Sequence, residues 1–184
     1  ELATVAGTPS PVAEQGTITG PVPLTPVQAR FFELNLPEMH HYNQAMLLEV
    51  RGPVDASLLA VAIKEILNQH DALRMRFRFN GDGWRAVITP PDDFVPFETI
   101  DLSQLGDIEQ SLAGHVVRLH TTLNLHDGPL LRAALFNRGG QHNRYLLIVI
   151  HHLVMDGVSW RILLEDFQTL YQQLVRGETP LLPA

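Results

Sequence analysis

Two adjacent histidines, His151 and His152, are the residues whose type and position in this chain could do chemistry. They end the apolar run YLLIVI, and Asp156 and Gly157 follow after three further apolar residues. Successive side chains on a strand point to opposite faces, so we expect the two imidazoles to diverge. One can reach a cleft while the other faces protein interior. The pattern therefore predicts one working base, not a pair.

An imidazole suits acid/base chemistry, because its unperturbed pKa of about 6.5 lets it take or give a proton near neutral pH. Each residue of the segment also has a structural interpretation: a histidine at a strand end is commonly a hydrogen-bonded structural group, Asp156 can cap a helix, and Gly157 can serve a turn. Ser159 is not expected to be a nucleophile, because it lacks the surrounding GxSxG pattern. The whole pattern HHxxxDG, between a strand and a helix, favours a functional site.

The elements that must position this segment alternate between helix and strand. Thr25 and Pro26 suit the cap and first turn of a helix, and Gly177 suits the end of the last one. Helices are expected over residues 25–36, from 55 or 57 to 70, 107–123 and 159–176, and strands over 44–51, 74–79, 84–88, 97–101, 130–137 and the run before the histidines. This mixture predicts an α/β (α+β) fold, a helix-on-sheet sandwich.

Composition narrows the function classes. The chain has 184 residues, 45% of them hydrophobic, which is enough to bury a core as one domain. Its net charge is −7, without any Lys/Arg run, which argues against nucleic-acid or membrane partners. It has no cysteine and no long apolar run, so the sequence predicts no disulfide and no membrane span. Neither HExxH nor a supported histidine cluster occurs, so no metal site is expected.

Residues 1–22 differ in composition from the rest. They are rich in Pro, Gly and Thr and show little hydrophobic periodicity, as linkers do. We therefore expect a linker over 1–22 and a folded unit over 23–184, although a tail without function remains an equal interpretation of the first segment.

Four motifs, in order, resemble those of nonribosomal peptide synthetase condensation-type domains, which share the chloramphenicol-acetyltransferase-like fold. HHLVMDG at 151–157 is similar to their HHxxxDG signature, and its continuation VSW to Trp160 resembles the form found in epimerization domains. The motifs LTPVQARFF at 24–32, HYNQ at 41–44 and HDALRMRF at 70–77 are similar to PIQxWF, HxNQ and HDALRxRF. Arg30 departs from the opening motif, which usually has Trp there.

The resemblance implies roles for individual residues. His152 would be the acid/base, and Asp156 would hold the motif loop through an arginine, for which Arg74 is the candidate. His151, Gly157, Ser159 and Trp160 would support the motif, with Gly157 allowing close backbone approach. The chain itself would bind no cofactor, because the substrate is carried on the phosphopantetheine of a carrier domain.

The resemblance also implies the architecture of the parent protein. Residues 1–22 would be the tail of an upstream peptidyl carrier domain with its linker, and 23–184 the N-terminal lobe of a two-lobed, cytoplasmic domain. The C-terminal lobe would supply a second acid/base, a Glu. A single lobe should be inactive, and its apolar face toward the missing lobe should make it self-associate.

Three functions remain open at this stage. The leading one is epimerization, which inverts the α-carbon of an aminoacyl or peptidyl thioester from L to D. A condensation domain of the same fold would form an amide bond instead. A lobe that only docks a carrier domain is the third.

Overall fold

The computed structural model describes residues 16–139 and 144–182. In chain order its strands are β1 (Gly20–Val22), β2 (Asn43–Val50), β3 (Met75–Phe79), β4 (Trp84–Ile88), β5 (Phe97–Asp101), β6 (Leu131–Asn137) and β7 (Arg144–His151). Its helices are α1 (Pro26–Glu33), α2 (Ala56–Gln69), α3 (Ile108–Thr121) and α4 (Gly157–Val175), with 3-10 turns at Met39–His41 and Asp71–Arg74. No helix of these residues is long and apolar enough to cross a membrane.

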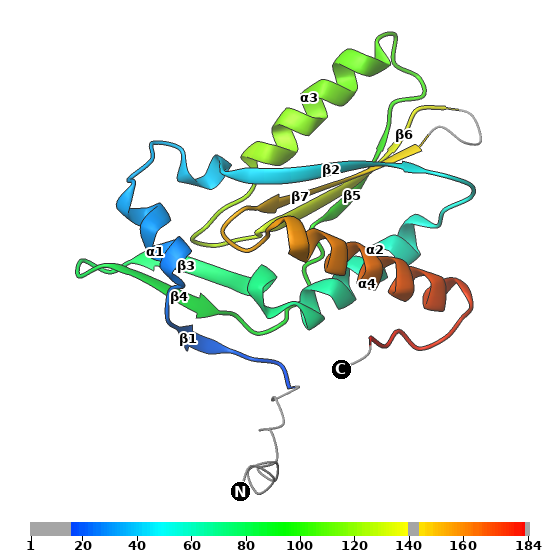
Figure 1. Ribbon diagram of the computed structural model, residues 1–184. Helices are drawn as coiled ribbons and strands as arrows, with labels where there is room; N and C mark the ends of the chain where they lie inside the picture. Colours follow the sequence, from blue (N-terminus) through cyan, green and yellow to red (C-terminus); the bar gives the residue numbers. More distant parts are fainter. Residues whose placement is uncertain (1–15, 140–143, 183–184) are drawn as a thin grey trace, which may run out of the picture.

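A four-stranded sheet in the order β2-β7-β6-β5 forms the centre of the fold. β7 runs antiparallel to both neighbours, and β5 is parallel to β6. Helix α3 covers one face of this sheet, and α2 and α4 lie together on the other (Figure 1). The predicted helix-on-sheet sandwich is therefore confirmed.

Strand β7 is buried on both faces, and its alternation decides which core each residue joins. Ile148 and Ile150 pack with Leu163 of α4 and its neighbours, whereas Leu147 and Val149 pack with Leu119 of α3 and others on the opposite side. Two-sided burial explains why the sequence of this strand is continuously apolar and does not alternate with polar residues. His151 and His152 come directly after these residues and continue their alternation between the two faces of the sheet.

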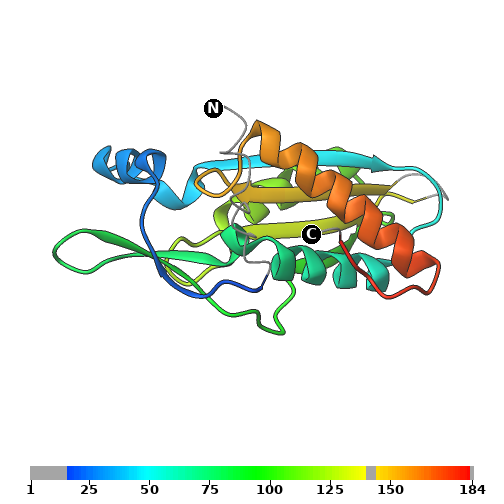
Figure 2. The same cartoon turned by 60° about the horizontal axis from the view of Figure 1, so that its bottom comes forward.

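A second sheet, β1-β4-β3, packs beside the first with α1 (Figure 2). Its core joins Phe31 and Phe32 of α1 to Phe77 of β3. Strand β1 pairs with β4 and lies in the segment that the sequence predicted to be linker. Strand β1 has only three residues, one of them Pro21, and Pro23 follows directly. So short a segment shows no hydrophobic pattern from which an edge strand could be predicted.

The boundaries of the remaining elements agree with the sequence to within a few residues. The largest difference is α1, which ends at Glu33 and not near residue 36, and Asn35 beyond it has a positive φ of 45°. Gly177, predicted to end the last helix, follows the C-cap of α4 with φ of 71° and donates its N–H to Leu174 O. A left-handed residue there closes the helix at little steric cost only if it is glycine.

The two-sided core yields a stability prediction. Phe136 of β6 is fully buried beneath α3, so Phe136→Ala should lower the free energy of unfolding by about 3–5 kcal/mol through lost burial and the cavity left behind. The same substitution at Phe79, whose side chain is 59% exposed, is the matched control and should cost about 1 kcal/mol or less. Urea unfolding monitored by circular dichroism measures both. Equal losses would contradict this packing.

Candidate functional site

His151 points into the protein, as the strand alternation predicted. Its side chain is fully buried, its Nε2–H donates to Met39 O at 2.8 Å, and its Nδ1 accepts the N–H of Leu153 at 3.2 Å. Burial lowers the pKa of His151 from 6.5 to about 4, against the smaller raising effect of the Met39 bond. His151 is therefore a neutral group that fixes the turn after β7.

His152 points the other way, toward α4 and the surface. Its main-chain N–H donates to Tyr42 O at 2.8 Å, and the ring of Tyr42 stacks on its imidazole with centroids 4.9 Å apart. Its Nδ1 lies 2.6 Å from Met155 O. A carbonyl only accepts, so the proton sits on Nδ1 and the lone pair of the neutral ring sits on Nε2. The predicted divergence of the two histidines is confirmed.

The imidazole of His152 lies at the boundary of two cavities. One, of about 490 Å³, is formed mainly by apolar side chains of α1 and the segment after it. The other, of about 620 Å³, opens toward β1 and the start of α4. The first is lined by Pro26, Val27, Arg30, Phe31, Leu34, Leu36, Tyr42, His152 and Leu153. A substrate group can thus approach the ring of His152 through mostly apolar surroundings.

Gln44 completes the polar contacts of this imidazole, and Trp160 in turn forms a hydrogen bond with Gln44. Gln44 Nε2 is 3.0 Å from His152 Nε2, and the indole N–H of Trp160 donates to Gln44 Oε1 at 2.8 Å. Gln44 pairs across the sheet with Ile150, which shares the α4 side with His152. The HYNQ and VSW motifs, separate in sequence, therefore meet at one histidine.

Gln28 is a positioning residue to which the sequence analysis assigned no role. Its side chain is buried, accepts from Thr25 N–H to close a capping box at α1, and donates to Leu153 O at 3.1 Å. It thereby ties the first helix to the residue after the histidine pair. The spacing of Thr25 and Gln28 is the capping-box pattern, which predicts the helix start but not the distant bond.

Asp156 caps α4, which was the structural interpretation of this residue. Its Oδ1 accepts the N–H groups of Ser159 at 2.8 Å and Val158 at 3.0 Å, and these bonds, that of Ser159 first, lower the pKa of its carboxyl group. Gly157 begins the helix, and a Cβ there would meet no atom within 4 Å. The expected close approach at Gly157 thus involves no described residue of this chain.

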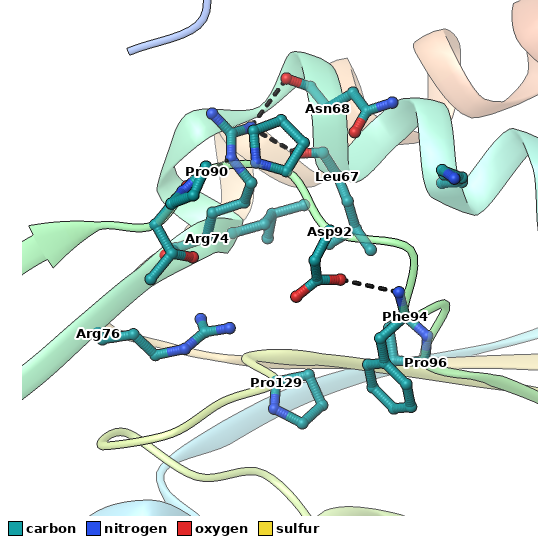
Figure 3. Close-up of a pocket in the computed structure, with 13 residues that line it drawn as sticks. Leu67, Asn68, Arg74, Arg76, Pro90, Asp92, Phe94, Pro96 and Pro129 are labelled. Carbon is teal, nitrogen blue, oxygen red and sulfur yellow. Dashed lines mark hydrogen bonds between the residues drawn. The ribbon is translucent and has the colours of Figure 1, made fainter. Parts of the chain in front are cut away.

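The predicted partnership of Arg74 with Asp156 is wrong. Arg74 is buried, forms an ion pair with Asp71, and donates to the carbonyl groups of Leu67 and Asn68 at the end of α2. Further bonds reach Thr89 O and Ile18 O. Figure 3 shows the guanidinium turned toward α2. Arg74 therefore satisfies the free carbonyl groups at the end of α2 and joins this helix end to the segment before β1, which is a structural role.

The space below Arg74 is a small cavity of about 40 Å³ that also borders Arg76 and Pro129 (Figure 3). It is not lined by His152 and is separate from the two cavities described above. Within the described residues, no three His, Asp or Glu side chains gather as a metal site would require.

Comparison with known proteins identifies the family. The model of the condensation domain family matches residues 18–184. The chain belongs to this family. Two of the large proteins that make up the linear gramicidin synthase of Brevibacillus parabrevis are similar to the condensation-type chain, one at 46% identity over 175 residues and another at 44% over 186 residues. These alignments include 93% and 100% of the chain but only 2% and 4% of the two relatives.

Solved structures agree on the fold. The epimerization domain from the third module of tyrocidine synthetase B superposes with a TM-score of 0.87 at 35% identity, over 93% of this chain and 39% of that one. The first condensation domain of the calcium-dependent antibiotic synthetase superposes with a TM-score of 0.77 at 26% identity, over 91% of this chain and 40% of that one. The condensation-type chain thus spans about two fifths of each.

The burial of His151 sets a pH dependence of stability. The folded chain keeps His151 neutral down to about pH 4, whereas the unfolded chain binds a proton near pH 6.5. The free energy of unfolding should therefore fall as the pH drops from 6.5 to 4, by about 3 kcal/mol from this group, and not further below pH 4.

Urea titrations between pH 3.5 and 7.5 test this dependence by comparing the wild type with His151→Gln, which cannot titrate. In His151→Gln, the fall in the free energy of unfolding between pH 6.5 and 4 should lose most of the part that comes from His151. His115→Gln, a change on α3, should keep it. An unchanged slope in His151→Gln would contradict the assignment.

Proposed function

We propose that this condensation-type chain is the N-terminal lobe of an epimerization domain, which inverts the α-carbon of an aminoacyl or peptidyl thioester from L to D. The observation that carries the proposal is the geometry of His152. Its Nδ1–H donates to Met155 O, its Nε2 lies 3.0 Å from Gln44 Nε2, and the residue lines two largely apolar cavities. The similarity to a tyrocidine synthetase epimerization domain supports the same function.

The reaction needs a base at a carbon atom. Nε2 of His152 would take the α-proton, and the electron pair of the broken C–H bond would spread into the thioester carbonyl group as an enolate. Return of a proton to the opposite face of that carbon gives the D centre. An apolar cleft favours this step, because it keeps competing water from the enolate.

The substrate would arrive on the phosphopantetheine arm of an upstream peptidyl carrier domain, so this chain needs no bound cofactor of its own. Residues 1–22 would include the end of that carrier domain and its linker, and the whole assembly would work in the cytoplasm. Their composition supports this interpretation, although residues 1–15 lie outside the described part of the structure.

A second lobe would complete the site and supply the opposite acid/base. The chain corresponds to 39% of the solved epimerization domain, and the cavity beside His152 has exposed apolar side chains on its rim, among them Val27, Leu34 and Tyr42. We propose that the second lobe covers this rim. The isolated lobe would then turn over no substrate.

Amide formation by a condensation domain is the second candidate. The family match and the similarity to a condensation domain of the calcium-dependent antibiotic synthetase favour it. In that reaction Nε2 of His152 would take a proton from an acceptor amine as it attacks the thioester. The two candidates use the same imidazole and differ in product.

Chiral analysis of the released acid tests the proposal in the two-lobed parent domain, supplied with an L-aminoacyl carrier thioester. The wild type should produce a mixture of D and L acid. His152→Ala should lower the rate of D formation by about 100-fold or more, because a general base typically contributes that much. The matched control His115→Ala, on α3, should keep it. D formation unaffected by His152→Ala would contradict the assignment of His152.

A further inference from the structure

Trp160, Gln44 and His152 form a continuous chain of hydrogen bonds that ends on the reactive imidazole. The indole Nε1 of Trp160 is 2.8 Å from Gln44 Oε1, Gln44 Nε2 is 3.0 Å from His152 Nε2, and His152 Nδ1 is 2.6 Å from Met155 O. Trp160 is buried and Gln44 is half-buried. Few alternative partners are therefore open to either side chain.

The donor and acceptor of each of these three hydrogen bonds follow from the chemistry of the groups. An indole N–H only donates, so Gln44 must present its oxygen to Trp160. Its NH₂ group then faces His152, whose Nε2 must accept. At the other side of the ring, Met155 O accepts from Nδ1–H. A single donor on Trp160 thus decides, through the amide of Gln44, that a donor and not an acceptor faces Nε2.

We infer that Trp160 is a positioning residue that acts through Gln44 to present His152 as a proton acceptor at Nε2. A proton on Nε2 would bring two N–H donors face to face, and Trp160 prevents the amide of Gln44 from turning its oxygen to the ring. The resting site therefore has the lone pair at Nε2. This inference deepens the proposed function and rests on it for its catalytic consequence.

The consequence is that one group removes a proton from one face of the α-carbon and a different group returns a proton to the other face. His152 accepts the first α-proton, whose C–H bond breaks toward Nε2, and the group on the opposite face donates. The amide of Gln44 occupies the lone pair until substrate arrives and must give way to the α C–H group. The stacked ring of Tyr42 holds the plane of the imidazole during this exchange.

A purely structural role predicts something different. A buried indole needs a hydrogen-bond partner in any case, so Trp160 could use Gln44 only to satisfy its own N–H. Trp160→Phe would then affect stability and leave both the imidazole and the chemistry alone. A readout at the ring of His152 separates the two interpretations.

The first measurement is nitrogen-15 NMR of the histidine rings in this chain, with the signals of His152 assigned by their loss in His152→Ala. The wild type should show a proton on Nδ1 and a hydrogen-bonded acceptor at Nε2. Trp160→Phe should change the Nε2 resonance, and Gln44→Glu, which puts an acceptor there, should move a proton onto Nε2. Trp84→Phe, the same change at the other tryptophan, should leave the His152 signals unchanged.

The second measurement is D formation in the two-lobed parent domain. Trp160→Phe and Gln44→Met should each lower the rate by about 10-fold, and the double variant should lower it no further, because residues that act through one another are not additive. Gln44→Glu should lower the rate of D formation by about 100-fold or more, because a proton on Nε2 leaves His152 without a free lone pair to act as base. Trp84→Phe should match the wild type.

The outcomes separate this inference from the proposed function. An unchanged His152 spectrum in a folded Trp160→Phe variant, or multiplicative losses in the double variant, would overturn the inference that Trp160 acts through Gln44. Gln44→Glu has nearly the shape of the wild-type residue, so an unchanged His152 spectrum in this variant would also overturn the inference, even if Trp160→Phe fails to fold. A parent domain that produces no D acid would defeat the epimerization proposal, while the spectra would still decide how His152 is held.

Discussion

The burial of β7 on both faces is the constraint on which the site depends. Residues on one side pack under α3 and those on the other under α2 and α4, so a shift by one position would exchange the two cores. The main-chain N–H groups of His151 and His152 continue the pairing, to Leu130 O and Tyr42 O. The strand therefore delivers two adjacent imidazoles to opposite sides with no freedom to exchange them.

This separation gives chemically identical side chains different properties. His151 is enclosed, has protein partners on both nitrogens, and is kept neutral by burial. His152 has one nitrogen fixed by Met155 O and the other beside Gln44 at the meeting of two cavities. The start of β2, more than 100 residues earlier in the sequence, and the first turn of α4 meet beside His152, where Trp160 binds Gln44 and Gln44 binds the imidazole.

Much of this arrangement could be predicted from the sequence, because strand alternation and hydrophobic periodicity are local properties. They predicted the sandwich, most of the helices and strands, and the divergence of the histidines. Asp156 was recognisable as a helix cap from its position alone. The pattern also indicated Trp160 and Gln44 as motif residues, although no local rule could show that their side chains touch.

The errors concern long-range pairing. Arg74 and Asp156 are oppositely charged motif residues, but Asp71 lies three positions from Arg74 and the end of α2 offers free carbonyl groups, so these nearer partners bind the guanidinium. The bond from Gln28 to Leu153 O joins residues 125 positions apart and leaves no sequence signature beyond the cap it also serves. Strand β1 was missed because an edge strand of three residues needs its partner β4 to exist.

The central claim is that His152 removes a proton from carbon. Incubation of the two-lobed parent domain with an L-aminoacyl carrier thioester in heavy water, followed by mass analysis of the released acid, tests it most directly. The account predicts one solvent deuterium at the α-carbon, in D product as it forms. Acid that contains no deuterium, together with a new amide when an acceptor amine is supplied, would contradict it and assign the same imidazole to condensation.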